Sequence, residues 1–364
     1  MIGVRAAGSD GERRGAEYIA QQLESFGYDV EFQKFPIPIY EGVTTKLEVL
    51  GGDVYTSNAA NFSASASAAA ELVAVPGIGE PTDFPSQTAG RIALIERGSI
   101  LLREKAANAE AAGAVGVIIY NNAPGNFTAS GGPVVDIPTV TVSQEHGQVL
   151  RSLAASSAVQ VSLSVEAVVN EGESLNVVAR MPDSGQCQVV VGGHIDSVPA
   201  GPGANDNASG TAVALELART LAAQDKTDGV CFAFFGAEEA GLQGSFHYVR
   251  QKSAEELDAM LGMLNFDMLA VGEQWPMVGS SALVSLAIEK ADEIGVNAFP
   301  GDPPEGVGSD HAPFIQAGVP SILFNCFCDA NYHTAADRAE FVKAERLDIA
   351  GEIGLRMVED LLGG

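Results

Sequence analysis

The stretch QVVVGGHID, residues 188–196, is a nearly continuous apolar run with a histidine and an aspartate at its end. Apolar runs without alternation are typical of strands that a parallel sheet buries on both faces. Three more runs of this kind occupy 175–181, 230–236 and 263–268. Helical patterns separate or follow them, at 208–223, 244–251, 254–260, 281–294 and 344–362. This alternation predicts an α/β fold with a mostly parallel (mixed) central sheet flanked by helices.

The chain before this α/β region has two parts that differ in their predicted secondary structure. Apolar spacings of three and four predict a helix over 12–26, and alternation predicts a strand over 28–35. Residues 57–70 form an uncharged tract that is expected to be a loop or a loosely patterned edge. Beyond residue 45 the predicted elements are one helix, 101–112, and short strands at 70–75, 91–96, 115–120, 137–142 and 158–165. We therefore predict a discontinuous domain of residues 1–45 and 166–364, interrupted by a small β-rich insert of residues 46–165.

Composition excludes several classes of protein. The 364 residues include 20 Lys and Arg against 47 Asp and Glu, which gives a net charge of −27. Such a surface repels nucleic acids and anionic membranes, so neither is an expected partner. No stretch reaches the roughly 18 apolar residues that a membrane span needs. Residues 1–5 lack the apolar core of a signal peptide, but a mature chain without its leader would look the same, and we expect a secreted or extracytoplasmic protein.

Polar residues gather where the predicted strands end. In open α/β sheets, ligands bind beyond the carboxyl ends of the strands. Taken alone, His194 and Asp196 could be a buried pair without a metal, and Asp206 could only cap the next helix. Two adjacent carboxylates after an apolar strand, however, are costly unless a cation or solvent receives them. Together these segments place at least two histidines and four carboxylates on one rim: His194, Asp206, Glu238, Glu239, Asp267 and His333.

The motifs around these residues resemble those of the co-catalytic di-zinc aminopeptidases of the aminopeptidase S/Y family, which includes bacterial leucyl aminopeptidases. Residues 192–337 carry that family's motifs in order: His-x-Asp, Asn-Asp-Asn-x-Ser-Gly, Gly-x-Glu-Glu-x-Gly, Asn-x-Asp, Ser-Asp-His and Tyr-His-Thr. Residues 89–98, AGRIALIERG, resemble part of the protease-associated (PA) domain that some members carry as an insert. The resemblance covers nearly the whole chain and implies a fold of the zinc-exopeptidase type with an inserted PA domain.

The resemblance also implies two Zn²⁺ ions per chain. Three protein ligands for each ion would leave room for a shared water. Asp206 would bridge both ions. His194 and Asp267 would complete the site of one ion, and Glu239 and His333 would complete the other. The ligand types also admit cobalt or manganese.

The same resemblance assigns the catalytic roles. Glu238 would be the general base that activates the zinc-bridged water. Tyr332 would help to stabilise the oxyanion, and Asp196 would orient His194. His311 has a supporting role in this pattern and is left out of the metal set. The implied reaction is hydrolysis of the N-terminal residue from peptides that have a free N-terminus.

Other functions stay open at this point. A carboxypeptidase or dipeptidase could use the same fold, but a carboxypeptidase needs a cation for the terminal carboxylate. The cations between residues 187 and 336 all fall in or just after predicted helices, away from the motif loops: Arg219, Lys226, Arg250, Lys252 and Lys290. An acyltransferase similar to glutaminyl cyclases would use one zinc ion, and a binding module that kept the fold without the chemistry would need no zinc. The complete ligand set argues against both alternatives. The sequence carries no prediction of the oligomeric state.

The four cysteines allow a geometric prediction. Cys187 and Cys231 each lie seven residues before a motif residue at a strand end, so on neighbouring parallel strands they would lie side by side. A disulfide is compatible with that spacing in an oxidising compartment, and two buried thiols are the alternative. Cys326 and Cys328 are expected to be too close in sequence for an easy mutual bridge.

Overall fold

The computed structural model describes residues 2–127, 129, 135–302, 308–326 and 328–363. Its contacts divide the chain into two compact units. The larger unit comprises Met1–Ile37, Glu173–Pro303 and Gly308–Gly364, and the insert unit is formed chiefly by Pro38–Gly172. Within the described residues, no helix is both long and apolar enough to cross a membrane.

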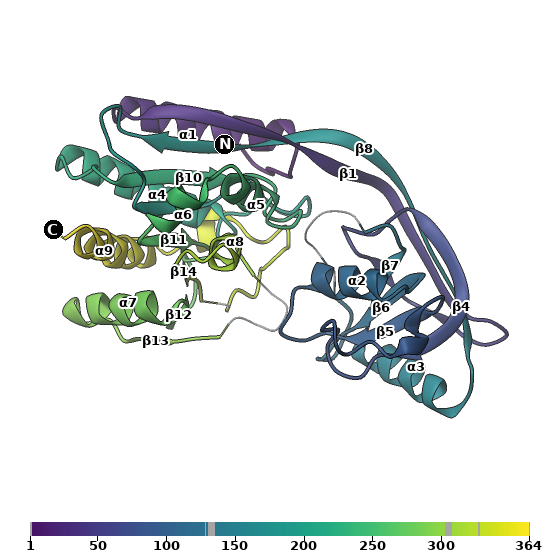
Figure 1. Ribbon diagram of the computed structural model, residues 1–364. Helices are drawn as coiled ribbons and strands as arrows, with labels where there is room; N and C mark the ends of the chain where they lie inside the picture. The colour runs from purple at the N-terminus through teal and green to yellow at the C-terminus, as the bar shows by residue number, and fades with distance from the viewer. Residues whose placement is uncertain (1, 128, 130–134, 303–307, 327, 364) are drawn as a thin grey trace. The chain divides into compact units, whose positions relative to one another are not determined.

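A mixed, mostly parallel sheet forms the centre of the larger unit (Figure 1). Its strands are β8 (Gln160–Arg180), β9 (Val189–His194), β10 (Val230–Phe235), β11 (Gly262–Phe266), β12 (Trp275–Gly279), β13 (Ala298–Pro300) and β14 (Ser321–Phe324). They lie in the order β13-β12-β14-β11-β9-β10-β8. The central strands β14, β11, β9 and β10 are parallel, whereas β8 is antiparallel to β10 and β12 is antiparallel to β14. The edge strand β13 is parallel to β12. The predicted fold class is confirmed.

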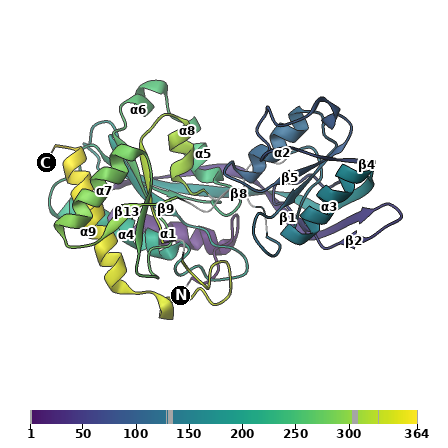
Figure 2. The ribbon, with the colours of Figure 1, turned by 90° about the horizontal axis from the view of Figure 1, so that it is seen from below.

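Helices cover both faces of this sheet, as Figure 2 shows from below. One face carries α1 (Asp10–Ser25), α4 (Ala208–Ala223), α7 (Ser281–Glu293) and α9 (Ala344–Leu361). The other carries α5 (Gln243–Arg250), α6 (Ala254–Asp258) and α8 (His311–Gln316). Val189 and Val191 of β9 pack with the first group, and Val190 packs with the second. Successive side chains of a strand point to opposite faces of the sheet, and helices cover both faces. The side chains on each face must therefore be apolar, which explains the unbroken apolar run.

The register of the central strands brings the predicted site residues to one rim. His194 of β9 is paired with Phe235, the last residue of β10. Gly192 of β9 is paired with Asn265, near the end of β11. The loops that follow these three strands therefore leave the sheet at the same edge.

The insert unit has its own sheet, with one helix on each face. Its strands β3 (Asn58–Ala59), β4 (Ala66–Ala74), β5 (Ile92–Glu96), β6 (Gly116–Tyr120) and β7 (Thr139–Val142) lie in the order β4-β5-β6-β7-β3. Helix α2 (Leu102–Ala111) packs on one face and α3 (Gln144–Ser156) on the other. Strand β4 begins at Ala66, inside the tract that was expected to be a loop or an edge.

Two of the connections between the units run through long strands, β1 (Asp29–Val49) and β8. Strand β1 pairs with β8 and with the short β2 (Val54–Tyr55). The sequence predicts two separate strands, 158–165 and 175–181, where the structure has the continuous β8. The intervening residues are mostly exposed, the apolar Val168 and Val169 included, so they carry no alternating apolar pattern, and pairing with β1 keeps the backbone extended.

Both cysteine pairs form disulfides. Cys187 and Cys231 are bonded with their Cα atoms 5.6 Å apart, so the disulfide that the sequence allowed is present. Cys231 lies on β10, but Cys187 precedes β9, and β10 pairs Cys231 with Val190, so the two cysteines are not paired across neighbouring strands as predicted. Cys326 and Cys328 are also bonded, so the expectation that they are too close for a mutual bridge is wrong. Their Cα atoms are 5.2 Å apart, within the usual range for a disulfide. Separation in space, and not separation along the chain, decides whether a bridge forms.

Candidate metal centre

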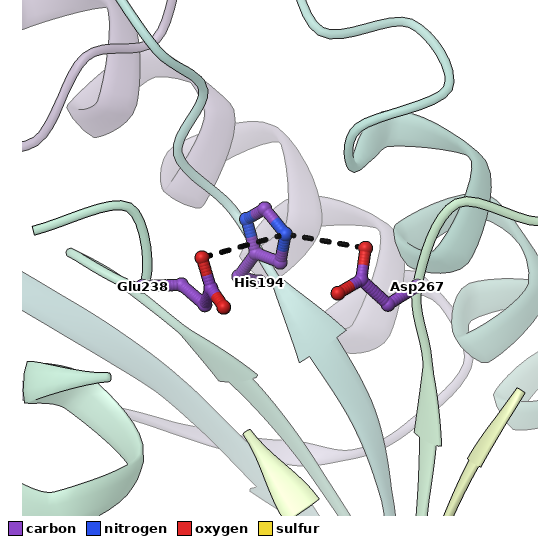
Figure 3. Close-up of side chains that lie close together, drawn as sticks. All are labelled: His194, Glu238 and Asp267. Carbon is purple, nitrogen blue, oxygen red and sulfur yellow. Dashed lines mark ion pairs between the residues drawn. The ribbon is translucent and has the colours of Figure 1, made fainter. Parts of the chain in front are cut away.

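The rim of the sheet collects side chains from several segments. His194 is the last residue of β9, Glu238 and Glu239 lie in the turn after β10, and Asp267 follows β11. Asp206 lies in the loop before α4 and His333 in the segment between β14 and α9. Figure 3 shows the His194 ring between Glu238 and Asp267, with one ring nitrogen facing both carboxylates. The structure therefore brings all the predicted metal ligands together.

Asp206 joins two clusters of potential ligands. Its Oδ1 lies 3.2 Å from Nε2 of His194, and its Oδ2 lies 3.2 Å from Nε2 of His333. Oδ1 of Asp267 lies 3.4 Å from the same nitrogen of His194. Oε2 of Glu239 lies 3.0 Å from Nε2 of His333. Each histidine thus faces one oxygen of Asp206 and one further carboxylate, which is the arrangement that a carboxylate shared by two ions requires.

The donor set fits zinc. Nitrogen and oxygen ligands lie about 2.0–2.1 Å from zinc, so two ligands of a tetrahedral ion are about 3.3 Å apart. The four histidine–carboxylate distances, from 3.0 to 3.4 Å, match that separation. Oδ1 of Asp267 and Oε1 of Glu239 are also buried without a hydrogen-bond partner in the chain. Buried carboxylate oxygens of this kind are stabilised by a cation.

Glu238 lies beside these clusters. Its Oε2 is 4.0 Å from Nε2 of His194, which is longer than any of the four distances above. It belongs to a group with His194 and Asp267 in which all ligand-type atoms lie within 4.8 Å. We regard Asp206 as the better third ligand for this group because its distance to His194 matches a tetrahedral site and that of Glu238 does not. Glu238 is therefore free to act on a proton.

Protonation of the metal-free site reflects the crowding of carboxylates. Burial raises the pKa of Glu239 to about 7, and Asp206 adds to this effect. Burial, assisted by Glu239 and opposed by His194, raises the pKa of Glu238 well above its usual range. Burial opposes the protonated form of His333, but Asp206 and Glu239 outweigh it and raise the pKa of His333 to about 10. At neutral pH the metal-free chain thus holds protons that a bound cation must displace.

Neighbouring groups fix the orientation of the aspartates. The carboxylate of Asp337 accepts hydrogen bonds from the backbone N–H groups of Asn205, at 2.7 Å, and Asp206, at 2.9 Å. The hydroxyl of Ser309 donates to Oδ2 of Asp267 at 2.7 Å. Ser309 belongs to the Ser-Asp-His motif and Asp337 follows the Tyr-His-Thr motif, but the motifs alone did not reveal these roles. Because Ser309 binds Oδ2 of Asp267, the other oxygen, Oδ1, is left to face His194.

Asp196 supports the site through both its backbone and its side chain. Its carbonyl oxygen lies 3.2 Å from Nδ1 of His194, and its nearer carboxylate oxygen lies 3.6 Å from the same nitrogen. The carboxylate accepts hydrogen bonds from the N–H groups of Glu238, at 3.0 Å, and Glu239, at 3.1 Å. Asp196 therefore orients the histidine chiefly through its carbonyl, and its side chain holds the turn that carries the two glutamates.

Two further motif residues lie close by. The ring of Tyr332 stacks on that of His333 at 3.7 Å between centroids. Desolvation, assisted by Glu239 and Asp206, raises the pKa of the Tyr332 phenol even though 45% of the residue is exposed, so the phenol is protonated at neutral pH. His311 is the first residue of α8 and lies outside both clusters; burial lowers its pKa to about 4.

Two residues near the start of the chain contact the site loops and were missed by the sequence analysis. The guanidinium of Arg5 donates to the carbonyl oxygens of Ile195, Pro202 and Gly203 at 2.7, 2.7 and 2.9 Å. The carboxylate of Glu12 accepts from the N–H of Ala237 at 3.0 Å. The available signal is the position of Glu12, which lies four residues before the buried Ala16 on the apolar side of α1, where a charged residue is unusual.

Comparisons with known proteins agree with this geometry. Residues 176–358 match peptidase family M28, and residues 54–150 match the PA domain. The chain is 35% identical to aminopeptidase YwaD of Bacillus subtilis (strain 168), over 97% of this chain and 80% of that protein. Among solved structures, an aminopeptidase from Aneurinibacillus sp. strain AM-1 is similar with a TM-score of 0.78 and 31% identity. A zinc aminopeptidase from Bacillus subtilis is similar with a TM-score of 0.65 and 33% identity.

The coverage of the two structural matches is high. In both cases the similarity extends over 98% of this chain and 90% of the other. The resemblance inferred from the motifs and the PA insert are both confirmed. The chain therefore belongs to peptidase family M28 and carries a PA domain.

Proposed function

We propose that this member of peptidase family M28 is a zinc-dependent aminopeptidase that holds two zinc ions and uses Glu238 as its general base. The observation that carries the number of ions is Asp206, whose two oxygens face His194 and His333 separately. The zinc aminopeptidase among the similar structures supports the choice of metal. The aminopeptidases among the relatives support the reaction.

The chain's own residues would perform most steps of the hydrolysis. Zinc, when bound, lowers the pKa of water and polarises the scissile carbonyl. Glu238 accepts the proton of the attacking water and delivers it to the departing amine. A raised pKa suits a group that must take up and release a proton near neutral pH. Tyr332, protonated at neutral pH, donates a hydrogen bond to the oxygen that becomes negative in the tetrahedral intermediate.

The charges around the site favour the amino end of a peptide. Zinc, when bound, would offset the charges of its ligand carboxylates, so Glu238 is the group at the rim that would attract an ammonium group and repel a carboxylate. Arg5 is a cation close to the site loops, but its donors bind three carbonyl oxygens. Cations on the helices have acidic partners there: Arg219 pairs with Glu216, and Lys226 with Glu359. These contacts weaken the carboxypeptidase alternative.

A panel of aminoacyl anilides tests the proposal. We expect cleavage of anilides with a free amine, preferably with an apolar first residue, and little cleavage after acetylation of that amine. A chelator should abolish the activity, and metal analysis should find about two zinc ions per chain, as a shared carboxylate implies. Equal rates on free and acetylated substrates, or release of residues from the carboxyl end, would contradict an aminopeptidase. A single bound ion would contradict the two-zinc site.

We also propose that the protein works in an oxidising compartment outside the cytoplasm. Its two disulfides support this location, because stable disulfides are rare in the cytosol. Cysteines that react with an alkylating agent before any reduction, in protein taken from its natural host, would argue against it.

A further inference from the structure

Four backbone N–H groups of the turn that carries the two glutamates are held by side chains from other segments. The N–H of Gly236 donates to Oδ1 of Asn176 at 3.2 Å, and the N–H of Ala237 donates to Oε1 of Glu12 at 3.0 Å. The next two N–H groups, of Glu238 and Glu239, bind the carboxylate of Asp196, as described above. Four consecutive backbone donors therefore have acceptors outside the turn, and the direction of Glu238 depends on them.

Ala237 is the strained residue of this turn. Its φ is +52°, in the left-handed region that residues with a side chain rarely adopt. Met268 and His333 also have positive φ and lie beside or within the ligand-bearing segments. Strain of this kind persists only where the surroundings hold it in place. At Ala237 the contact that holds the N–H is Glu12, which is 225 residues away in the chain.

Glu12 is itself held firmly. It is fully buried in the first turn of α1 and has donors on both oxygens. Gly8 donates its N–H to Oε2 at 2.7 Å, and the hydroxyl of Ser174 donates to Oε1 at 2.8 Å. Added to the N–H of Ala237, these contacts link α1, β8 and the turn after β10 through one carboxylate. A Cβ atom at Gly236 would collide with Ser174 and Glu12, so the close approach also needs the glycine.

We propose that Glu12 is a positioning residue for the hydrolytic reaction: through the N–H of Ala237 it fixes the turn from which Glu238 reaches the attacking water. The proposal rests on the proposed function, in which Glu238 is the general base. Glu12 lies outside both ligand clusters, and its three hydrogen bonds go to groups that bind no metal. Its loss should therefore affect proton transfer and leave zinc binding and substrate binding in place.

Glu12→Gln is the first test, because the amide keeps the shape of the carboxylate but replaces one acceptor oxygen with a donor. A small misplacement of a catalytic group costs up to about 100-fold in rate, so we expect kcat to fall by about 10- to 100-fold. KM and the zinc content should stay within about twofold of the unchanged enzyme. Glu17→Gln, on an exposed position of the same helix, is the matched control and should leave all three quantities unchanged.

A double-mutant cycle separates positioning from a general loss of structure. If Glu12 acts through Glu238, adding Glu12→Gln to Glu238→Gln should lower the residual kcat by less than about twofold. Full additivity of the two effects would overturn the proposal, as would an unchanged kcat in folded, zinc-loaded Glu12→Gln. Full activity of Glu238→Gln would instead contradict the proposed function, so the two failures are distinguishable.

Ser174→Ala provides a second route if Glu12→Gln does not fold. It removes one donor to Oε1 of Glu12 and leaves the carboxylate and its bond to Ala237 intact. We expect a smaller fall in kcat, of about threefold to tenfold, with KM and zinc content unchanged. A wild-type kcat in this variant, together with an insoluble Glu12→Gln, would count against positioning by Glu12.

Discussion

Glu238 and Glu239 are adjacent in the chain, yet they face different partners. Glu239 lies 3.0 Å from His333, whereas Glu238 stays 4.0 Å from His194. Glu238→Gln should therefore keep both zinc ions and lower kcat by about 100-fold to 10,000-fold, because the proton acceptor is lost. Steady-state kinetics and metal analysis check this expectation. Glu239→Gln is the matched control and should lose zinc; the reverse pattern would mean that the two glutamates exchange roles.

For single residues, the sequence identifies side chains of a type that is unusual at their place in the predicted fold. Histidines and carboxylates at the ends of apolar strands stand out, and the motif order assigns them ligand roles. Residues that act through ordinary hydrogen bonds do not stand out in the same way. The contact between Glu12 and Ala237 depends on how α1 packs against the sheet, and no local pattern near residue 237 indicates it.

Among the elements, the loop between β9 and α4 depends most on one distant side chain. Arg5 is 8% exposed and binds carbonyl oxygens on both sides of this loop, which carries Asp206. Arg5→Ala leaves these carbonyls without their donor, and we expect the free energy of unfolding to fall by about 2–5 kcal/mol, with weaker zinc binding. Urea unfolding and zinc competition measure the two effects.

The neighbouring Arg14 offers a control for Arg5. Its hydrogen bonds are exposed, so Arg14→Ala should change the free energy of unfolding by less than about 0.5 kcal/mol. Arg5→Lys keeps the charge but cannot reach the same three carbonyls with a planar fork, so it should behave more like the alanine variant. Full stability and zinc affinity in Arg5→Lys would show that charge alone matters at this position.

The elements that the sequence predicts well are the long helices with a strong period and the unbroken apolar strands. Helices α4, α7 and α9 and strands β9, β10 and β11 lie within a few residues of their predicted ranges. Short elements were missed: β13 spans three residues and β14 spans four, too few for a period to be visible. Helix α3 was also missed; it buries only Gly147 and Leu150 fully, so its apolar face is sparse.

For the molecule as a whole, zinc and pH should act on stability together. In the metal-free protein the pKa of His333 is about 10 and that of Glu239 about 7. The unfolded values are about 6.5 for histidine and about 4.3 for glutamate. Both groups bind protons more tightly when folded, so the unfolded chain binds fewer protons. The stability of the metal-free protein therefore falls as pH rises, through about pH 4 to 7 for Glu239 and about pH 6 to 10 for His333.

Zinc binding should add a stabilisation that grows as pH rises, which is opposite to the pH dependence of the metal-free protein. Its ligands bind it in their deprotonated forms, so zinc binds more tightly as pH rises. We expect the difference in Tm between zinc-loaded and chelator-treated protein to widen from about pH 6 to about pH 9. Thermal unfolding at a series of pH values, at constant salt because of the net charge of −27, measures this difference. A difference that stays constant or narrows would contradict the assigned protonation states.

The hydrogen bonds of Arg5 and Glu12 also bear on the order in which the enzyme matures. These residues are translated before the groups that they hold, at 195–203 and 237, which follow about two hundred residues later. His333 and Asp337, which complete the other side of the site, come later still. A growing chain thus has no assembled peptidase site until His333 and Asp337 have been translated. A chain released before that point carries only fragments of the site.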